Sequence, residues 1–191
     1  MVGGIKMEKA SLIIVILLCC VILLVFYVIG IKNSLVNSRN KVLNQFSAID
    51  VELKRRIDLI PNLVSIVKGY VKHEENTFKE VIKLRNMALK SETINDKVKS
   101  DKELSKVVSK LFAISENYPE LKSNTNFMEL QKELSDCEDR IAYAREFYNN
   151  SVMNYNNEVE MFPTSVVAKL FRYKRYDYYE LDDKEKEVPK V

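Results

Sequence analysis

The chain has 191 residues, with 30 lysines and arginines against 27 aspartates and glutamates, and a formal net charge of +3. So small an excess does not indicate a dedicated nucleic-acid-binding protein, whose domains usually carry a strongly basic surface. Four glycines and four prolines are too few for the turns of a β-rich domain of this length. Composition therefore favours a helical protein. It also excludes a disulfide framework within one domain, because Cys137 is the only cysteine outside an apolar N-terminal run.

The first predicted element is a single membrane-spanning helix over residues 10–31, preceded by a short tail over residues 1–9. The run of 22 residues contains no charged side chain and no proline, and it is long enough to cross a hydrocarbon layer of about 30 Å. A cleaved signal peptide is disfavoured because such apolar runs are shorter, about 7–15 residues, and end in a small-x-small site. The run therefore predicts a protein of the cell membrane. Basic residues after the run favour a cytoplasmic position for the following domain, although lysines before it leave the opposite orientation open.

A long amphipathic helix is predicted to follow the span without a break. From Leu35 to Ile60 apolar residues recur mainly at steps of three and four, and the stripe resumes after Pro61 as far as Ala88. We expect Pro61 to kink or briefly interrupt the helix because it has no backbone donor. Gly69 is expected to permit close packing or to act as a hinge. The segment therefore either stays a rod or folds back on itself near these two positions.

The next part of the chain is predicted to be a loop followed by a short helix. Residues 89–103 are polar and without period, and Ser100 and Glu103 are placed to form a capping box at the end of the loop. Apolar residues at helical spacing then mark a short helix that stops at Tyr118.

A second long helix is predicted to start near Asn126, with Asn124 and Thr125 as alternative caps, and to stop at Phe162. Thr164 is expected to cap a last short helix. The predicted fold is all-α: an N-terminal transmembrane helix, then an antiparallel helical bundle of long helices over residues 32–172. A charged aromatic tail over residues 173–191 is expected to be partly disordered.

Two Tyr-Asn pairs recur one heptad apart on the second long helix. A buried asparagine in a coiled coil fixes helix register at a cost in stability, so we interpret these residues as a structural polar layer. On this interpretation Asn149→Leu leaves stability unchanged or raised. A ligand sensor or enzyme that uses the same layer is the alternative. The candidate layer comprises Arg140, Arg145, Tyr148, Asn149, Tyr155 and Asn156.

Charged residues on the first long helix allow two interpretations. Asp50, Lys54 and Asp58 are spaced at four residues, which favours a ladder of ion pairs on a solvated face. The alternative is that Arg55 or Arg56 reaches Glu138 across the bundle and fixes the register of the helices.

Catalytic and metal motifs are missing from the sequence. His73 is the only histidine, and Thr77 stands where a zinc-binding H-E-x-x-H helix requires the second histidine. Cys137 lies on the apolar stripe of its helix, so we expect it in the core. We therefore expect no enzyme activity, no catalytic residue, no metal and no cofactor.

The C-terminal region combines basic and aromatic residues. Arg172, Lys174 and Arg175 are candidate contacts to anionic lipid headgroups, since clustered basic residues near membranes bind such lipids. The acidic run over residues 180–183 cancels much of their field, so we expect no nucleic-acid partner. The alternative is a terminus that packs its aromatic residues on the bundle.

The motif string resembles the signature of the LemA family of bacterial membrane-anchored proteins, over about residues 33–172. The sequence departs from the family pattern at two places. It has Phe46 where the family often has tryptophan, and Arg172-Tyr173 where the family usually has Gly-Phe. The first half of the resemblance is carried by Arg39-Asn40, Asp50-Val51, Leu53-Lys54-Arg55-Arg56, Asp58-Leu59-Ile60-Pro61-Asn62-Leu63-Val64, Val67-Lys68-Gly69-Tyr70 and His73-Glu74. The second half is carried by Tyr118-Pro119, Phe127, Leu130-Gln131, Arg140-Ile141, Ala144-Arg145, Tyr148-Asn149, Tyr155-Asn156 and Phe162-Pro163.

The resemblance implies a transmembrane helix and a helical bundle, with no known enzyme activity, cofactor or catalytic residue. Some relatives are encoded near membrane proteases, which implies a protein partner among membrane-protein quality-control components. Together, the residues and the resemblance favour a membrane-anchored, non-enzymatic scaffold or interaction protein of the cell envelope. A membrane-surface binding or remodelling module is the alternative, and self-association is possible in either case.

Overall fold

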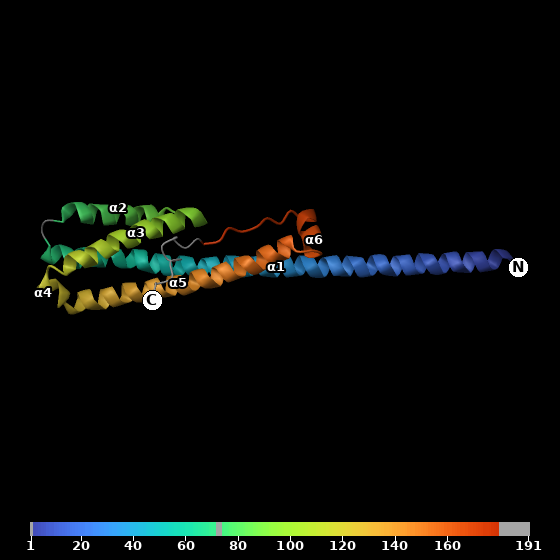
Figure 1. The fold of residues 1–191 in the computed structure, drawn as a ribbon, viewed down its shortest axis with the longest axis horizontal. Coiled ribbons are helices and arrows are strands. Elements are labelled where there is room, and N and C mark those ends of the chain that lie inside the picture. The colour runs from blue at the N-terminus through green and yellow to red at the C-terminus, as the bar shows by residue number, and fades with distance from the viewer. Residues whose placement is uncertain (1, 72–73, 180–191) are drawn as a thin grey trace, which may run out of the picture. The chain divides into compact units, whose positions relative to one another are not determined.

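The computed structural model of the protein describes residues 2–71 and 74–179, and for residues 2–11 only the backbone. The described residues form six helices and no strand (Figure 1), which confirms the all-α prediction. The helices are α1 (Val2–Tyr70), α2 (Glu75–Leu89), α3 (Ile94–Ser115), α4 (Pro119–Lys122), α5 (Thr125–Glu160) and α6 (Thr164–Leu170).

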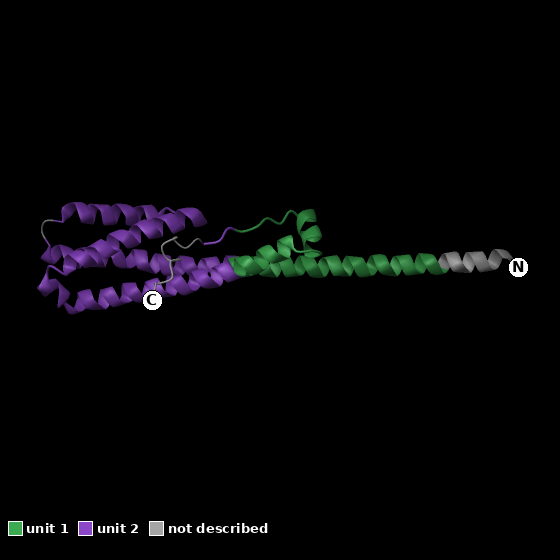
Figure 2. Cartoon of the chain, viewed as in Figure 1, with its two compact units in different colours: residues 1–42, 151–176 green, residues 43–150, 177–191 purple. Residues whose placement is uncertain are grey.

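The chain divides into two compact units (Figure 2). Unit 1 comprises residues 1–42 and 151–176, and unit 2 comprises residues 43–150 and 177–191. Unit 1 contains the apolar part of α1, where all side chains from Leu12 to Tyr27 are exposed. Among the described residues α1 is the one helix long and apolar enough to cross a membrane, with an 18-residue window of mean hydropathy 3.6.

Unit 2 is an antiparallel helical bundle, as predicted. Arg140 of α5 pairs with Glu52 of α1, and Asn124, at the start of α5, donates to the Tyr70 hydroxyl. Helices α1 and α5 therefore run antiparallel, because residue 140 lies beside residue 52 and residue 124 beside residue 70. The core is formed by the apolar stripes of these helices and of α2 and α3, together with Leu121 of α4. Its fully buried residues include Ile60, Leu63, Val67, Val81, Leu111 and Leu121.

The helix continues through Pro61 and ends at Tyr70, after which α2 follows from Glu75. Because proline has no N–H, it leaves the carbonyl of Ile57 without its helical partner. Arg85 of α2 supplies the missing donor through its Nε atom, 3.2 Å from the Ile57 oxygen. Of the kink and the brief interruption expected at Pro61, the interruption is wrong, since the helix continues through the proline and a side chain from the neighbouring helix binds the carbonyl that the proline frees.

Gly69 lies one residue before the end of α1. A Cβ atom added there would have no atom within 4 Å, so the glycine is not needed for close packing. Helix α2 runs back along α1, because Lys68 lies over the Phe78 ring and Arg85 reaches the Ile57 carbonyl, which agrees with the folded-back alternative rather than the rod.

The third helix starts earlier than the sequence indicated. Thr93 caps α3, because its side chain accepts a hydrogen bond from the Asp96 N–H. Ser100 lies inside the helix and donates to the carbonyl oxygens of Asp96 and Lys97. The predicted capping box at Ser100 and Glu103 is therefore wrong: Thr93 and Asp96 have the same spacing and lie one turn beyond the end of α2.

Two further helix ends differ from expectation in detail. Asn124, one of the three candidates, caps α5 through a hydrogen bond from the Phe127 N–H at 3.0 Å. Thr164 does not cap α6, because its hydroxyl donates to the carbonyl oxygens of Glu158 and Met161 at the end of α5. The tail over residues 173–191 is expected to be partly disordered; of these residues the structure describes 173–179, in which Tyr179 is 2% exposed, and residues 180–191 lie outside the described chain.

Candidate functional site

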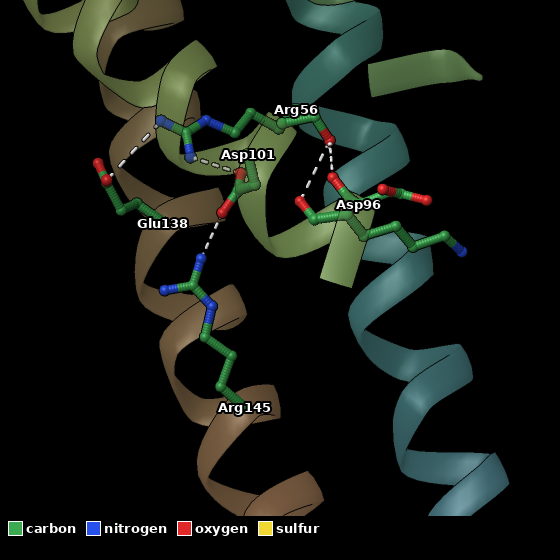
Figure 3. Close-up of polar contacts among 7 residues, drawn as sticks. Arg56, Asp96, Asp101, Glu138 and Arg145 are labelled. Atoms are coloured by element: carbon green, nitrogen blue, oxygen red, sulfur yellow. Dashed lines mark hydrogen bonds and ion pairs between the residues drawn. The ribbon is translucent and has the colours of Figure 1, made fainter. Parts of the chain in front are cut away.

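A buried carboxylate joins three helices of unit 2 (Figure 3). Asp101 of α3 accepts from Arg56 of α1, with 3.1 Å between Oδ1 and Nη1, and from Arg145 of α5 through its other oxygen. The second guanidinium nitrogen of Arg56 lies 3.7 Å from Glu138 Oε1. The side chains of Asp101 and Arg56 are each 4% exposed, so their pairing takes place away from water.

This cluster confirms the alternative in which Arg56 reaches Glu138, and it adds a partner that the sequence did not indicate. Asp101 falls on the apolar stripe of α3, three residues before Leu104 and seven before Val108. A carboxylate on such a stripe is a signal of a buried, paired charge. Asp50 does not pair with Lys54 in the predicted ladder. Both carboxylate oxygens of Asp50 instead accept from the Lys97 ammonium at 2.6 Å.

The arrangement of charges is suited to holding helices in register rather than to proton transfer. Buried ion pairs cost desolvation that only good geometry and further hydrogen bonds offset, and breaking one leaves an uncompensated buried charge. Each oxygen of Asp101 already has a cationic partner. No group of three potential metal-binding side chains occurs among the described residues.

The end of the described chain covers this cluster in unit 2. The Asn149 amide bonds the Tyr179 backbone twice: its nitrogen donates to the carbonyl at 3.0 Å and its oxygen accepts from the N–H at 2.8 Å. The Tyr148 hydroxyl donates to the Asp177 carbonyl at 2.9 Å. The Tyr179 ring lies 4.7 Å from the Arg145 guanidinium, a cation–π contact.

Tyr179 is the most perturbed titratable group among these residues. Burial raises the pKa of its phenol from the ordinary 10.0 to about 12, because the charged phenolate would be poorly solvated there. The Arg145 guanidinium offsets part of this increase in the pKa. The hydroxyl makes no hydrogen bond of good geometry within the described residues.

In unit 1 the second Tyr-Asn pair also binds the backbone of the C-terminal segment. Asn156 donates to the Tyr176 carbonyl and accepts from its N–H, both at 3.0 Å, while the Tyr155 hydroxyl donates to the Lys174 carbonyl. The Tyr155 and Tyr176 rings meet edge to face, with centroids 5.3 Å apart. Burial raises the pKa of Tyr155.

The structure therefore separates the six residues of the predicted polar layer into two groups. Arg140 and Arg145 form ion pairs with Glu52 and Asp101. The two tyrosines and two asparagines bind the backbone of residues 174–179 instead of an asparagine on another helix. The sequence missed this partner because the tail, with its charges and few aliphatic residues, resembles a solvated terminus.

The predicted lipid-contact residues lie in unit 1, and they differ in their contacts. Arg172 and Lys174 are exposed and line a hollow of about 540 Å³ together with Lys32 and Arg39. Arg175 also lines it, but its guanidinium pairs with Glu160 at 2.8 Å. The hollow is further lined by Tyr155, Phe171, Tyr173 and Tyr176.

A separate groove in unit 2 is bordered by lysines. Its volume is about 620 Å³, and among the described residues that line it Glu75 is the one carboxylate, paired with Lys79 at 2.8 Å. The lining combines four lysines with three large apolar side chains: Lys68, Lys79, Lys83, Lys90, Phe78, Ile82 and Met87, with Asn86.

Of the two residues considered for chemistry, the structure describes Cys137 alone. Cys137 is fully buried, as expected for a core residue. His73 lies outside the described residues.

Comparisons with known proteins agree with the resemblance in the sequence. The sequence model of the LemA family matches residues 45–191. The chain is 27% identical to protein LemA of Metamycoplasma hominis over 147 residues, which are 75% of this chain and 66% of that protein. It is 33% identical over 73 residues to magnetosome protein MamQ 2 of Paramagnetospirillum magneticum, which is 38% of this chain and 27% of that one. It is 35% identical over 72 residues to magnetosome protein MamQ of Magnetospirillum gryphiswaldense, of which it covers 26%. The chain thus spans less than two thirds of the length of these relatives.

Proposed function

The chain belongs to the LemA family, and from this premise we propose that it is a membrane-anchored, non-enzymatic helical scaffold of the bacterial cell envelope. The observation that carries the proposal is the exposed apolar part of α1: an 18-residue window of mean hydropathy 3.6, none of it buried. A helix of this length and hydropathy matches the hydrocarbon thickness of a bilayer. Residues 10–31 would be the anchor. The domain would face the cytoplasm, because Lys32, Arg39 and Lys41 follow the span.

The pairing of the buried charges supports a non-enzymatic role. Asp101 has two cationic partners, and Asp50 is bound by Lys97. A hollow of about 360 Å³ adjoins both carboxylates and could serve the alternative function, a ligand sensor. Because a ligand there would compete with ion pairs that already exist, the scaffold is the better supported of the two functions.

The lysine-bordered groove of unit 2 is the surface through which the scaffold would bind a partner. Four lysines and one paired glutamate leave the lining with an excess of positive charge, while Phe78, Ile82 and Met87 provide apolar area. The complementary occupant is an acidic amphipathic segment of another protein, because charge complementarity steers association and apolar contacts supply affinity. Membrane-protein quality-control components are the partners that we propose, as the resemblance implies.

Photocrosslinking in the native membrane tests the groove. A photoreactive residue replaces Met87, which is 52% exposed in the groove, or Met128, which is 48% exposed outside it and serves as the matched control. We expect Met87 alone to capture a protein through a net acidic peptide, and Lys79→Glu with Lys83→Glu to abolish the capture. Lys110→Glu with Lys132→Glu is the charge control, since both lysines are exposed and lie outside the groove.

A capture that survives reversal of Lys79 and Lys83, or that maps to a basic peptide, would contradict the proposed partner.

The membrane anchor and the orientation of the domain are tested by a separate experiment. A single cysteine at the exposed Ser123, in a chain whose native cysteines are replaced, is labelled by an impermeant maleimide. Labelling only after the cells are opened supports a cytoplasmic domain, whereas labelling of intact cells reverses the orientation. Recovery of the protein in the soluble fraction without detergent would refute the anchor itself.

A further inference from the structure

The short helix α6 and the turn before it expose an unusual amount of apolar surface. Val166 is 59% exposed and Leu170 is 71% exposed, and their spacing of four residues puts them on the same face of the helix. Met161 and Phe162, in the preceding turn, are 62% and 84% exposed, and Phe171 is 43% exposed. Exposed apolar side chains gathered in so short a segment mark a site where a protein meets another apolar surface.

The opposite face of α6 packs on the end of the apolar part of α1. Val167 and Ala168 are buried against Ile31 and Leu35, and Val28 packs against the same cluster. All these residues belong to unit 1. Residues 28 and 31 are in the last turn of the proposed span, and residue 35 is about 6 Å further along the helix axis. The exposed face of α6 is therefore held at the level where the hydrocarbon of a bilayer would end.

Cations surround this patch. The ammonium of Lys32 lies 4.9 Å from the centre of the Phe171 ring, and Lys169, Arg172 and Lys174 are exposed. Among the described side chains of unit 1, two carboxylates lie on α5: Glu160 is paired with Arg175, and Glu158 accepts hydrogen bonds from the hydroxyls of Ser34 and Ser38. An apolar face bordered by exposed cations is the pattern of a segment that lies in the interface of an anionic membrane.

We infer that residues 161–171 form an interfacial foot, which inserts Met161, Phe162, Val166 and Leu170 at the boundary between lipid headgroups and acyl chains. Lys32, Arg172 and Lys174 would bind lipid phosphates, and Arg175 would not, because it is paired with Glu160. The inference rests on the proposed anchor, since the foot would bind the bilayer that holds the span. The foot would give the protein a second point of attachment to the membrane. With both attachments unit 1 is fixed against the membrane surface, whereas the span alone would let unit 1 tilt.

Depth-dependent quenching in vesicles tests the foot. The full chain, with its native cysteines replaced, is reconstituted into phosphatidylcholine vesicles that contain phosphatidylglycerol, with one fluorescent label per variant. Leu170→Cys reports on the foot and Val21→Cys on the span. Asn154→Cys is the matched control in unit 1, because it is exposed and lies seven residues before Met161 on α5, about 10 Å along the axis.

We expect lipids with a shallow quencher to reduce the Leu170 signal several times more than the Asn154 signal, and aqueous iodide to do the reverse. Deep quenchers should reduce the Val21 signal. If Val21 is quenched while Leu170 matches Asn154, the foot is wrong and the anchor stands. If Val21 is not quenched, the anchor is wrong. Protection of Leu170 from iodide without lipid quenching would show that a second copy covers the patch, which also overturns the foot.

Charge reversal tests the phosphate contacts separately. Adding phosphatidylglycerol should increase the shallow quenching of Leu170, and Arg172→Glu with Lys174→Glu should remove that increase. Lys132→Glu, an exposed lysine of unit 2, should leave it unchanged. An increase that persists in the double variant would overturn the assignment of these two cations. Val166→Cys provides a second label position if Leu170→Cys changes the far-ultraviolet circular dichroism spectrum.

Discussion

Basic side chains occur in both units of this chain, in opposite environments. In unit 2, Arg56 and Arg145 are buried or nearly so, and both bind Asp101. In unit 1, Arg172 and Lys174 are exposed around an open hollow. Arg56 and Arg145 therefore contribute to the stability of unit 2, whereas Arg172 and Lys174 are available for binding in unit 1. The difference is set by a carboxylate on a neighbouring helix, not by the basic residues themselves.

The largest expected effect comes from removing the charge of Asp101, which the buried arginines of unit 2 share. Asp101→Asn removes the charge that two guanidinium groups share, and we expect it to lower the free energy of unfolding by about 3–5 kcal/mol, as for other broken buried pairs. Chemical unfolding in detergent, followed by circular dichroism, measures the change. Arg172→Glu in unit 1 should leave the same transition unchanged, because that side chain is exposed.

Two controls separate the loss of the pair from general damage to α3. Glu103→Gln changes an exposed carboxylate of the same helix, paired with Lys106 at 2.9 Å, and should have no measurable effect. Replacing the whole cluster by Arg56→Met, Asp101→Leu and Arg145→Leu should recover most of the stability, since apolar residues of similar volume can substitute for a buried ion cluster. A triple variant no more stable than Asp101→Asn would argue against the ion cluster as the cause.

The second effect appears at high pH and depends on Tyr179. Its folded pKa of about 12 lies above the ordinary 10.0, so the folded state favours the protonated phenol. The contribution is complete below pH 10 and is lost as the pH rises from there through the folded pKa. At about 1.4 kcal/mol per pKa unit, stability falls by roughly 2–3 kcal/mol more in the wild type than in Tyr179→Phe. Unfolding curves of both proteins between pH 9 and pH 12 measure the difference, and parallel curves would exclude Tyr179 as the titrating group.

The third effect compares the two asparagines that hold the C-terminal segment. In a coiled-coil layer Asn149→Leu would leave stability unchanged or raised. Because the Asn149 amide makes two hydrogen bonds to the Tyr179 backbone, we expect instead a loss of about 1–3 kcal/mol. Asn156→Leu should cost a similar amount in unit 1, where the partner is Tyr176.

Amide hydrogen exchange distinguishes the two sites directly. Asn149→Leu should accelerate exchange at the Tyr179 N–H and leave Tyr176 protected, and Asn156→Leu should do the reverse. Acceleration of both amides by either variant would mean that the segment is released as one piece.

The sequence predicted the long helix α5 well, because its apolar stripe repeats over many turns and Phe162-Pro163 lies close to its end. The end of α1 at Tyr70 was left open between a rod and a chain that folds back. The sequence offered Arg55 or Arg56 as an alternative partner of Glu138, and in the structure Arg56 lies 3.7 Å from it. The start of α3 was missed because Thr93 stands between two polar stretches, where a cap is indistinguishable from a loop residue without the helix that it caps. The partner of the Tyr-Asn pairs was missed for a different reason. Hydrogen bonds from side chains to a non-helical backbone have no period, so only the folded chain reveals them.

The smallest effect concerns Pro61 and Arg85 in unit 2. Arg85→Met removes the donor 3.2 Å from the Ile57 carbonyl, and we expect a loss of about 1–2 kcal/mol because a partly buried acceptor is left unsatisfied. In a Pro61→Ala background the new N–H can take over this carbonyl, so Arg85→Met should then cost markedly less. The double-mutant cycle measures the coupling as the difference between these two losses in thermal or chemical unfolding. Equal losses in both backgrounds would mean that Arg85 stabilises α2 by other contacts, and that the helix tolerates Pro61 without its help.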